Sequence, residues 1–115
     1  MSPERDVRDY LSDILQSIED IRSFTSGMSF AQFTSDKKTI NAVIRSLEII
    51  GEAVKKIPSS IRSRHPELPW AEVAGMRDKL IHEYFGVDLE IVWETLQSDL
   101  GPFEVVVQKA LDGLD

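Results

Sequence analysis

The sequence of 115 residues contains no cysteine, which excludes disulfide bridges and sites where thiolates bind a metal. No apolar run approaches the roughly 20 residues that are needed to span a bilayer. The first ten residues, MSPERDVRDY, also lack the apolar region of a secretory signal. We therefore expect a soluble cytoplasmic protein with no membrane partner.

Glycine and proline are scarce, with six and five residues. Together with the abundant Leu, Ile, Glu and Lys, this composition predicts helices rather than sheet. Positive charge is not in excess either, because 13 Lys and Arg face 20 Asp and Glu and the net charge is −7. A general nucleic-acid binder is usually basic, so the balance argues against one, although a local basic cleft stays compatible with it. The length fits one domain, residues 1–115, with a core of its own.

Apolar residues recur at intervals of four and three in the first part of the chain, the spacing of an amphipathic helix. We expect Ser2 and Pro3 to begin this helix, as N-cap and first helical residue. Its apolar stripe consists of Val7, Leu11, Ile14, Ile18 and Ile21. A short connecting turn of helix, FAQF, follows.

The second long helix is expected to begin near Ser35 or Asp36, and it is apolar on two faces. Such a helix lies in the centre of a bundle or at an interface. A polar stripe that includes Glu48 and Glu52 runs between the two faces.

The rest of the chain predicts a loop with one helical turn and then two further helices. The first of these runs from about residue 69 to 85, and Asp88 is expected to cap the last one. Gly101 and Pro102 must kink or split the last helix, because proline removes a helix hydrogen bond. The sum is an all-α fold, an antiparallel bundle of four main helices plus a short extra helix.

The segment GMRDKLIHEYFGVD, residues 75–88, has the apolar spacing of a core helix but places Arg77 on its apolar face. A guanidinium keeps its proton and needs partners when it is buried. The residues alone leave a structural explanation open. Arg77 could snorkel to water, His82 could be a hydrogen-bonded structural residue, and Tyr84 could be a core aromatic.

The sequence on both sides of this segment carries more information. The stretches IIGEA (49–53), PW (69–70) and GMRDKLIHEYFGVDLEIVW (75–93) closely resemble the HEPN superfamily, specifically its HepT-like toxins. Their diagnostic motif is Arg-x4-His-x-Tyr, and Arg77, His82 and Tyr84 fit it without a gap. The resemblance covers nearly the whole chain, and it implies a HEPN-like bundle that acts as an endoribonuclease, the toxin half of a toxin–antitoxin pair.

The resemblance also implies partners. Members of this family form homodimers in which both copies of the motif converge on one cleft. The usual partner is an MntA-like nucleotidyltransferase antitoxin, which silences the toxin by transferring AMP from ATP to the motif tyrosine, here Tyr84.

The chemistry of RNA cleavage agrees with these residue types. RNA carries its own nucleophile, the 2′-hydroxyl. His82 can act as general acid or base near neutral pH, and Arg77 can bind the phosphate and stabilise the transition state. We therefore expect no metal and no other cofactor. Each chain has one motif histidine, whereas the reaction needs a base and a separate acid. A two-fold dimer would supply the second histidine.

Several neighbours could support the site, and each has an alternative. Asp78 could orient His82, or it could pair with Arg77 or Lys79. Arg62 and Arg64 could line the approach of RNA, or they could belong to an ordinary solvated loop.

Two acidic residues of the second helix are candidates to hold Arg77. Glu48 and Glu52 could do so, or they could pair with the nearby basic residues Arg45, Lys55 and Lys56.

The alternative function is a non-catalytic helical module that docks a nucleotidyltransferase, a nucleotide, or both.

Overall fold

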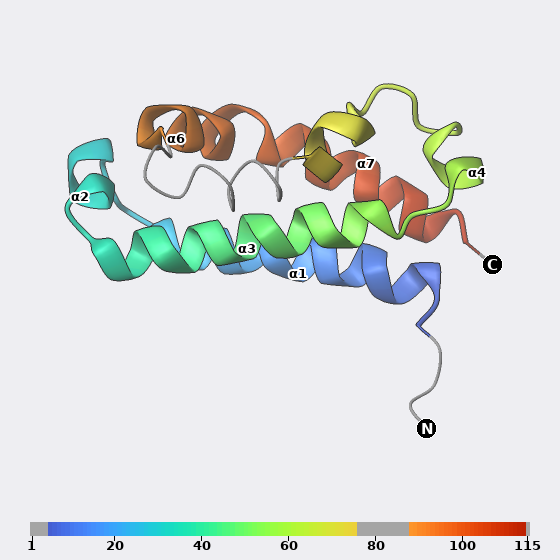
Figure 1. The fold of residues 1–115 in the computed structure, drawn as a ribbon, viewed down its shortest axis with the longest axis horizontal. Helices are drawn as coiled ribbons and strands as arrows, with labels where there is room; N and C mark the ends of the chain where they lie inside the picture. Colours follow the sequence, from blue (N-terminus) through green and yellow to red (C-terminus); the bar gives the residue numbers. More distant parts are fainter. Residues whose placement is uncertain (1–4, 76–87, 115) are drawn as a thin grey trace.

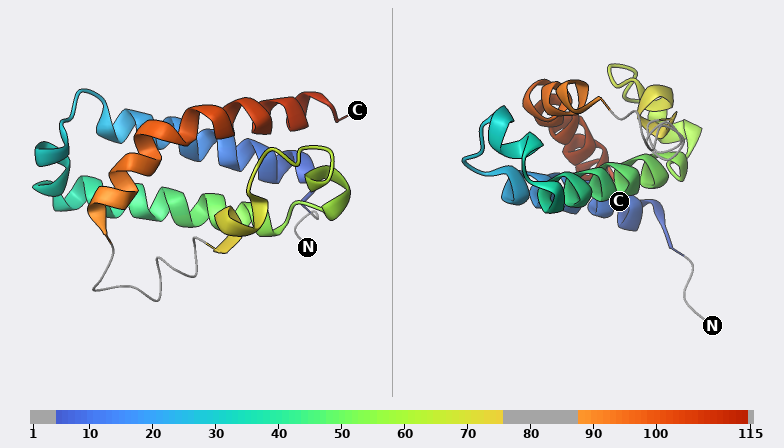
Figure 2. Two further views of the ribbon diagram at one scale, coloured as in Figure 1. Left: turned by 90° about the horizontal axis from the view of Figure 1, so that it is seen from above. Right: turned by 60° about the vertical axis from the view of Figure 1, so that its left-hand side comes forward.

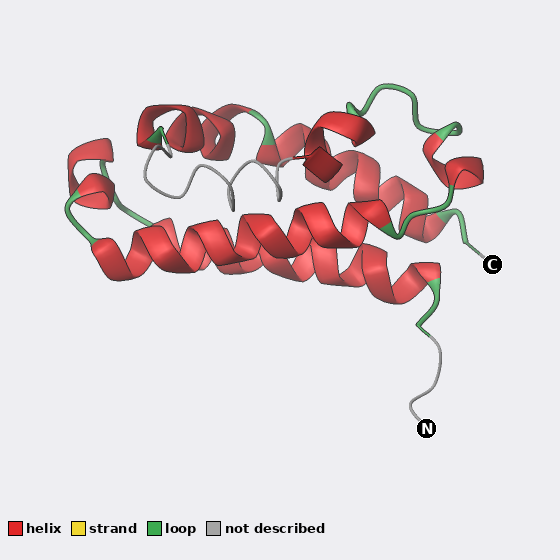
Figure 3. Ribbon diagram, viewed as in Figure 1, coloured by secondary structure: helices red, strands yellow, loops and turns green. Residues whose placement is uncertain are grey.

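The computed structural model describes residues 5–75 and 88–114. The helices in chain order are α1 (Val7–Thr25), α2 (Phe30–Thr34), α3 (Lys37–Lys55), α4 (Ser59–Arg62), α6 (Leu89–Ser98) and α7 (Leu100–Asp112). Residues 70–75 are also helical. Only turns and loops join the helices within the described ranges, as Figure 3 shows, so the predicted all-α class is confirmed. None of these helices is long and apolar enough to cross a membrane.

Helix α1 begins later than the sequence suggested. Its N-cap is Asp6, whose Oδ1 accepts hydrogen bonds from the backbone N–H groups of Arg8 (2.7 Å) and Asp9 (3.3 Å). Asp9 completes a capping box, since its Oδ2 accepts from the backbone N–H of Asp6 (3.2 Å). This reciprocal arrangement satisfies donors that have no partner inside the helix. The prediction that Ser2 and Pro3 begin the helix was therefore wrong.

The apolar stripe of α1 is buried as predicted except at Val7, which is half-buried. Leu11, Ile14 and Ile18 are fully buried and Ile21 nearly so. Helix α1 packs along α3 and also against α7, so its stripe lies at the centre of the core.

Helix α3 runs antiparallel to α1, and α7 also runs antiparallel to α1 (Figures 1 and 2). Val43, Leu47 and Val54 of the first apolar face of α3 are buried. Ala53, on the other face, is only 5% exposed, so this second face is covered within the chain for part of its length. A central position in the bundle accounts for a helix that is apolar on two sides.

The sequence predicted that the last helix is kinked or split at Gly101 and Pro102. The structure shows two helices, but the break between them lies before these residues. Helix α6 ends at Ser98, and Asp99 lies between it and α7. Pro102 is the third residue of α7, where a backbone N–H has no intrahelical acceptor. The proline is therefore accommodated in a first turn, and the helix has to end before it.

Two contacts between remote segments close the bundle. Arg22 of α1 donates from Nη1 to both carboxylate oxygens of Glu104 on α7 (2.7 and 2.8 Å). At the α2 end of the bundle, Trp93 of α6 packs against Phe33 of α2, with ring centroids 5.1 Å apart. Phe33 is fully buried, so α2 is an integral part of the core and not a simple linker.

Asp36 is the N-cap of α3, as expected from the sequence. Its Oδ1 accepts from the backbone N–H of Thr39 (3.1 Å) and its Oδ2 accepts from the Thr39 hydroxyl (2.8 Å). These hydrogen bonds, the backbone one first, lower the pKa of the Asp36 carboxyl below its ordinary value of 3.8. A lowered pKa in the folded state means that the ionised form favours folding.

We predict that Asp36→Asn, which keeps an acceptor but cannot ionise, destabilises the protein at neutral pH. The contribution of Asp36 is fully present above the pKa of the unfolded chain, near 3.8, and it is lost as the pH falls through the lower folded pKa. The thermal midpoints of wild type and variant should therefore converge as the solution is acidified. A difference in midpoint that is the same at neutral and strongly acidic pH would contradict this assignment.

Candidate functional site

The residues that the sequence places at the catalytic centre are Arg77, His82 and Tyr84, with Asp78 beside them. All four lie outside the described residues. The two ends of the segment, Gly75 and Asp88, are described.

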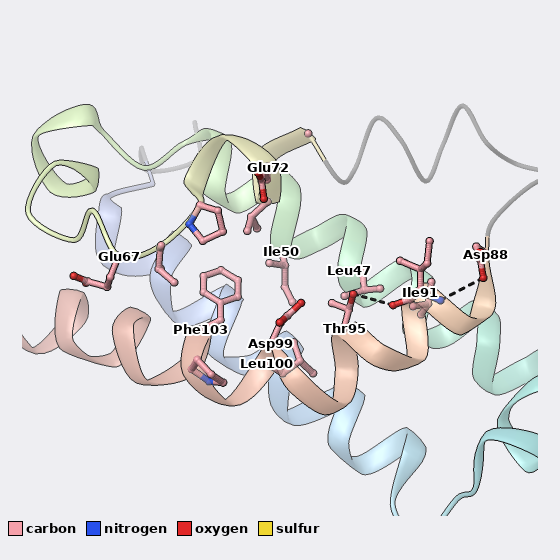
Figure 4. Close-up of a pocket in the computed structure, with 16 residues that line it drawn as sticks. Leu47, Ile50, Glu67, Glu72, Asp88, Ile91, Thr95, Asp99, Leu100 and Phe103 are labelled. Atoms are coloured by element: carbon pink, nitrogen blue, oxygen red, sulfur yellow. Dashed lines mark hydrogen bonds between the residues drawn. The ribbon is translucent and has the colours of Figure 1, made fainter.

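Both residues that flank this segment line one groove. Gly75 is the last described residue of the helical stretch 70–75, and Asp88 is the N-cap of α6; both line the groove. The groove has a volume of about 780 Å³ and lies between the stretch 67–75 on one side and α6 and α7 on the other, over α3 (Figure 4). The two ends of the motif segment are thus fixed next to the same hollow.

The floor of the groove is apolar. Ile50 of α3 and Phe103 of α7 lie at its centre in Figure 4, and both are buried. Further apolar side chains of its wall are Leu47, Leu68, Val73, Ile91, Val92 and Leu100.

The charged side chains among the described residues of the groove are all acidic: Glu67, Glu72, Asp88 and Asp99. Figure 4 shows Glu72 and Asp99 on opposite sides of Ile50. Four carboxylates repel an approaching phosphate. The described part of this groove is therefore unsuited to hold an RNA backbone.

Glu48 and Glu52, the candidates to hold Arg77, line a second hollow of about 390 Å³ between α1 and α3. Glu48 lies 3.6 Å from Nη1 of Arg45, so one of its alternative partners from the sequence is realised. On the α1 side, Arg5 forms an ion pair with Asp13 (2.8 Å). Both signs of charge meet in this hollow, which distinguishes it from the acidic groove.

The sequence suggested Arg62 and Arg64 as RNA contacts. The structure shows that their side chains differ in hydrogen bonding and exposure. Arg62 donates from Nη2 to the carbonyl of Val54 (2.7 Å) and from Nε to the carbonyl of Ile57 (2.9 Å). Arg64 is exposed. Arg62 thus caps the C-terminal end of α3, a role that sequence analysis missed because its acceptors are backbone atoms up to eight residues away.

Trp70 is a second residue whose role the sequence did not reveal. Its side chain is 6% exposed, and its Nε1–H donates to the backbone carbonyl of His65 (2.8 Å). The only available signal was the Pro-Trp pair itself, since a buried indole needs an acceptor. Trp70 fixes the first turn of the helical stretch that leads to the motif segment.

No three His, Asp or Glu side chains gather as metal ligands would within residues 5–75 and 88–114.

Comparison with known proteins decides the family. The model of the family described as "Ribonuclease HepT-like" matches residues 14–110. The chain belongs to the HepT-like ribonuclease family. This membership confirms the resemblance drawn from the Arg77, His82 and Tyr84 motif, and it places the chain among the ribonucleases.

Relatives of similar length support the same family. A protein of Methanocaldococcus jannaschii, named as a candidate RNase, is 48% identical over 113 residues, which are 98% of this chain and 97% of the relative. A protein of Thermococcus cleftensis, named as a probable ribonuclease HepT, is 53% identical over 105 residues, which are 88% and 96% of the two chains. No solved structure gave a significant match.

We predict that Asp88→Ala weakens the N-terminal end of α6. Asp88 Oδ1 accepts from the backbone N–H groups of Glu90 (3.0 Å) and Ile91 (3.3 Å). Loss of an N-cap costs about 1 kcal/mol of the free energy of unfolding. The urea midpoint should fall accordingly, and Asp88→Asn should retain most of the stability.

Asp99→Ala is the matched control, because the Asp99 side chain makes no cap hydrogen bond to α7. An equal loss of stability in the two alanine variants would show that capping is not what Asp88 contributes.

Proposed function

We propose that this chain is a metal-independent endoribonuclease and the toxin component of a toxin–antitoxin system that acts in the cytoplasm. Residues 1–115 would form a single HEPN-like domain. The observation that carries the proposal is the match to the HepT-like ribonuclease family together with a complete motif at Arg77, His82 and Tyr84. The names of relatives in Thermococcus and Methanocaldococcus as ribonucleases support it.

In the proposed reaction, the RNA 2′-oxygen attacks the adjacent phosphorus while the bond from phosphorus to the 5′-oxygen breaks. A base removes the proton of the 2′-hydroxyl, and an acid gives a proton to the leaving 5′-oxygen. The products are a 2′,3′-cyclic phosphate and a 5′-hydroxyl. We assign the proton transfers to His82 and stabilisation of the charge on the phosphoryl oxygens to Arg77.

A homodimer would complete this site. One His82 cannot act as base and as separate acid in the same step, and a two-fold axis brings equivalent residues of two copies together. Two copies of Arg77 in one cleft would also give a local positive charge to a chain whose net charge is −7. The acidic groove described above supports this view, since its described side chains offer no cation to RNA.

Residues around the motif would assist. Asp78 is proposed to orient His82, and Arg64, which is exposed, to contact RNA on its approach. Glu48 and Glu52 are proposed to hold Arg77, with Glu48 also 3.6 Å from Nη1 of Arg45.

Regulation is proposed to occur at Tyr84. An MntA-like nucleotidyltransferase antitoxin would transfer AMP from ATP to the Tyr84 hydroxyl and release pyrophosphate. The added adenylate brings bulk and negative charge beside Arg77, where it would compete with the RNA phosphate.

We predict that the purified protein cleaves RNA in the presence of EDTA and that His82→Ala abolishes cleavage while the helical circular dichroism is retained. Removing a general acid–base group lowers the rate by about 100- to 10,000-fold. His65→Gln, which changes the chain's other histidine, should cleave as wild type. The cleavage products are checked for 2′,3′-cyclic phosphate ends.

Undiminished cleavage by His82→Ala would remove His82 from the mechanism. If Arg77→Ala loses nucleotidyltransferase binding but leaves growth inhibition unchanged, the non-catalytic binding module is the correct function instead.

We predict that co-expression with an MntA-like nucleotidyltransferase raises the intact mass by whole adenylate increments and suppresses cleavage. Tyr84→Phe should show no increment, because the acceptor oxygen is gone. Tyr10→Phe is the matched control, since Tyr10 is the chain's other tyrosine. An increment that persists in Tyr84→Phe would place the modification elsewhere.

A further inference from the structure

The acidic groove has an exposed apolar residue in its wall. Ile91 of α6 lines the groove, and its side chain is 56% exposed. The other large apolar side chains that are exposed in the described ranges, Phe24, Phe30 and Val105, line neither hollow. Exposed apolar surface in a concave site is typical of a place where a partner binds.

Hydrogen bonds within the chain hold both walls of the groove. On one side, the indole Nε1–H of Trp70 donates to the carbonyl of His65 (2.8 Å). On the other side, the Thr95 hydroxyl donates to the carbonyl of Ile91 (2.9 Å), and Asp88 caps the start of α6. The groove is therefore formed without a partner, which lowers the entropic cost of binding one.

Two of the carboxylates in the groove have no partner in the described part of the chain. The Asp99 side chain makes no cap hydrogen bond to α7. Neither its carboxylate nor that of Glu72 takes part in an ion pair or a hydrogen bond with a described residue. Figure 4 shows Glu72 and Asp99 on opposite sides of Ile50. Two negative charges that no described residue neutralises thus flank an apolar floor.

We propose that this groove is the docking surface for a protein segment that carries an apolar side chain between lysines or arginines. The apolar side chain lies on the floor formed by Ile50 and Phe103, beside Ile91, and the cations pair with Glu72 and Asp99. An amphipathic helix in an apolar groove is a common form of such recognition. This role goes beyond the proposed function, because it requires no RNA cleavage.

The charge of the groove decides among the possible occupants. RNA and an anionic membrane would bring phosphates against four carboxylates, and like charges that meet at an interface cost free energy. A second copy bound through the same groove would bring the carboxylates of both chains together, because a two-fold interface joins identical surfaces. A basic protein segment has the complementary charge.

The first experiment uses a defined probe, a short fluorescent peptide with leucines on one face of a helix and lysines on both flanks. Its binding to the full-length protein is followed by fluorescence anisotropy. Glu72→Gln/Asp99→Asn should raise the Kd about 3- to 30-fold, as expected for two exposed ion pairs, and should reduce its salt dependence. Glu90→Gln/Glu94→Gln is the matched control, because it removes the same charge from exposed residues that line neither hollow.

An equal loss of affinity in the two double variants would overturn the proposal, because general attraction by the net charge of −7 would then explain the binding. Equal affinity for a peptide with glutamates in place of the lysines would also overturn it. So would the absence of binding of the lysine peptide to wild type.

The second experiment tests the apolar contact. Ile91→Ser should raise the Kd about 10-fold, because the peptide loses apolar contact area, and it should cost the fold little at an exposed position. Val105→Ser makes a comparable change on α7, at a residue that is 53% exposed and lines neither hollow, and it should leave the Kd unchanged. Unchanged affinity in Ile91→Ser would remove the groove as the docking surface.

The outcomes separate this surface from the proposed function. If wild type binds the peptide through the groove but does not cleave RNA, the proposed function fails and the docking surface stands. If it cleaves RNA but binds the peptide equally well in the groove variants, the docking surface fails and the proposed function stands. A fluorescent single-stranded RNA whose affinity falls in Ile91→Ser would assign the groove to RNA and overturn the proposal.

Discussion

The architecture depends on the burial of one apolar stripe, that of α1, between α3 and α7. Leu11, Ile14 and Ile18 are fully buried, and α3 and α7 both pack on the helix that carries them. Burying an aliphatic side chain stabilises a fold by about 1.5–3 kcal/mol. Further contacts attach other described elements. Phe33 of α2 packs against Trp93 of α6, and Arg62 binds the end of α3.

The two hollows of the molecule differ in the charges that line them. The groove next to Gly75 and Asp88 is apolar at its floor and acidic at its described rim, whereas the hollow between α1 and α3 mixes both signs. A ribonuclease with a net charge of −7 must concentrate its cations where RNA binds. The proposed site, with arginines from two chains, would meet this requirement.

Much of the fold could be predicted from the sequence, because the apolar periodicity of α1 and α3 is regular and the N-caps Asp36 and Asp88 are of the preferred type. The start of α1 could not, since Ser2 with Pro3 and Asp6 with Asp9 are both acceptable beginnings, and a reciprocal pair of hydrogen bonds decides between them. The break before α7 was expected at Gly101 and Pro102. It lies at Asp99 because a proline fits in a first turn.

The candidate site was less predictable for a different reason. The motif of Arg77, His82 and Tyr84 is visible in the sequence, and its placement stays a prediction because it lies outside the described residues. The hydrogen bonds from the Arg62 and Trp70 side chains to backbone carbonyls have no sequence signature. Backbone carbonyls are acceptors at every position, and only the folded chain determines which of them these side chains reach.

The pair of Arg22 and Glu104 joins residues 82 positions apart, and it lies where α7 closes over α1. Helices α1 and α3 can pair as soon as the first half of the chain has been synthesised, because the contact between them is local. The cover supplied by α7 comes from residues 82 positions further along the chain. Its formation closes a long loop, so we expect it to be slower than the pairing of α1 with α3.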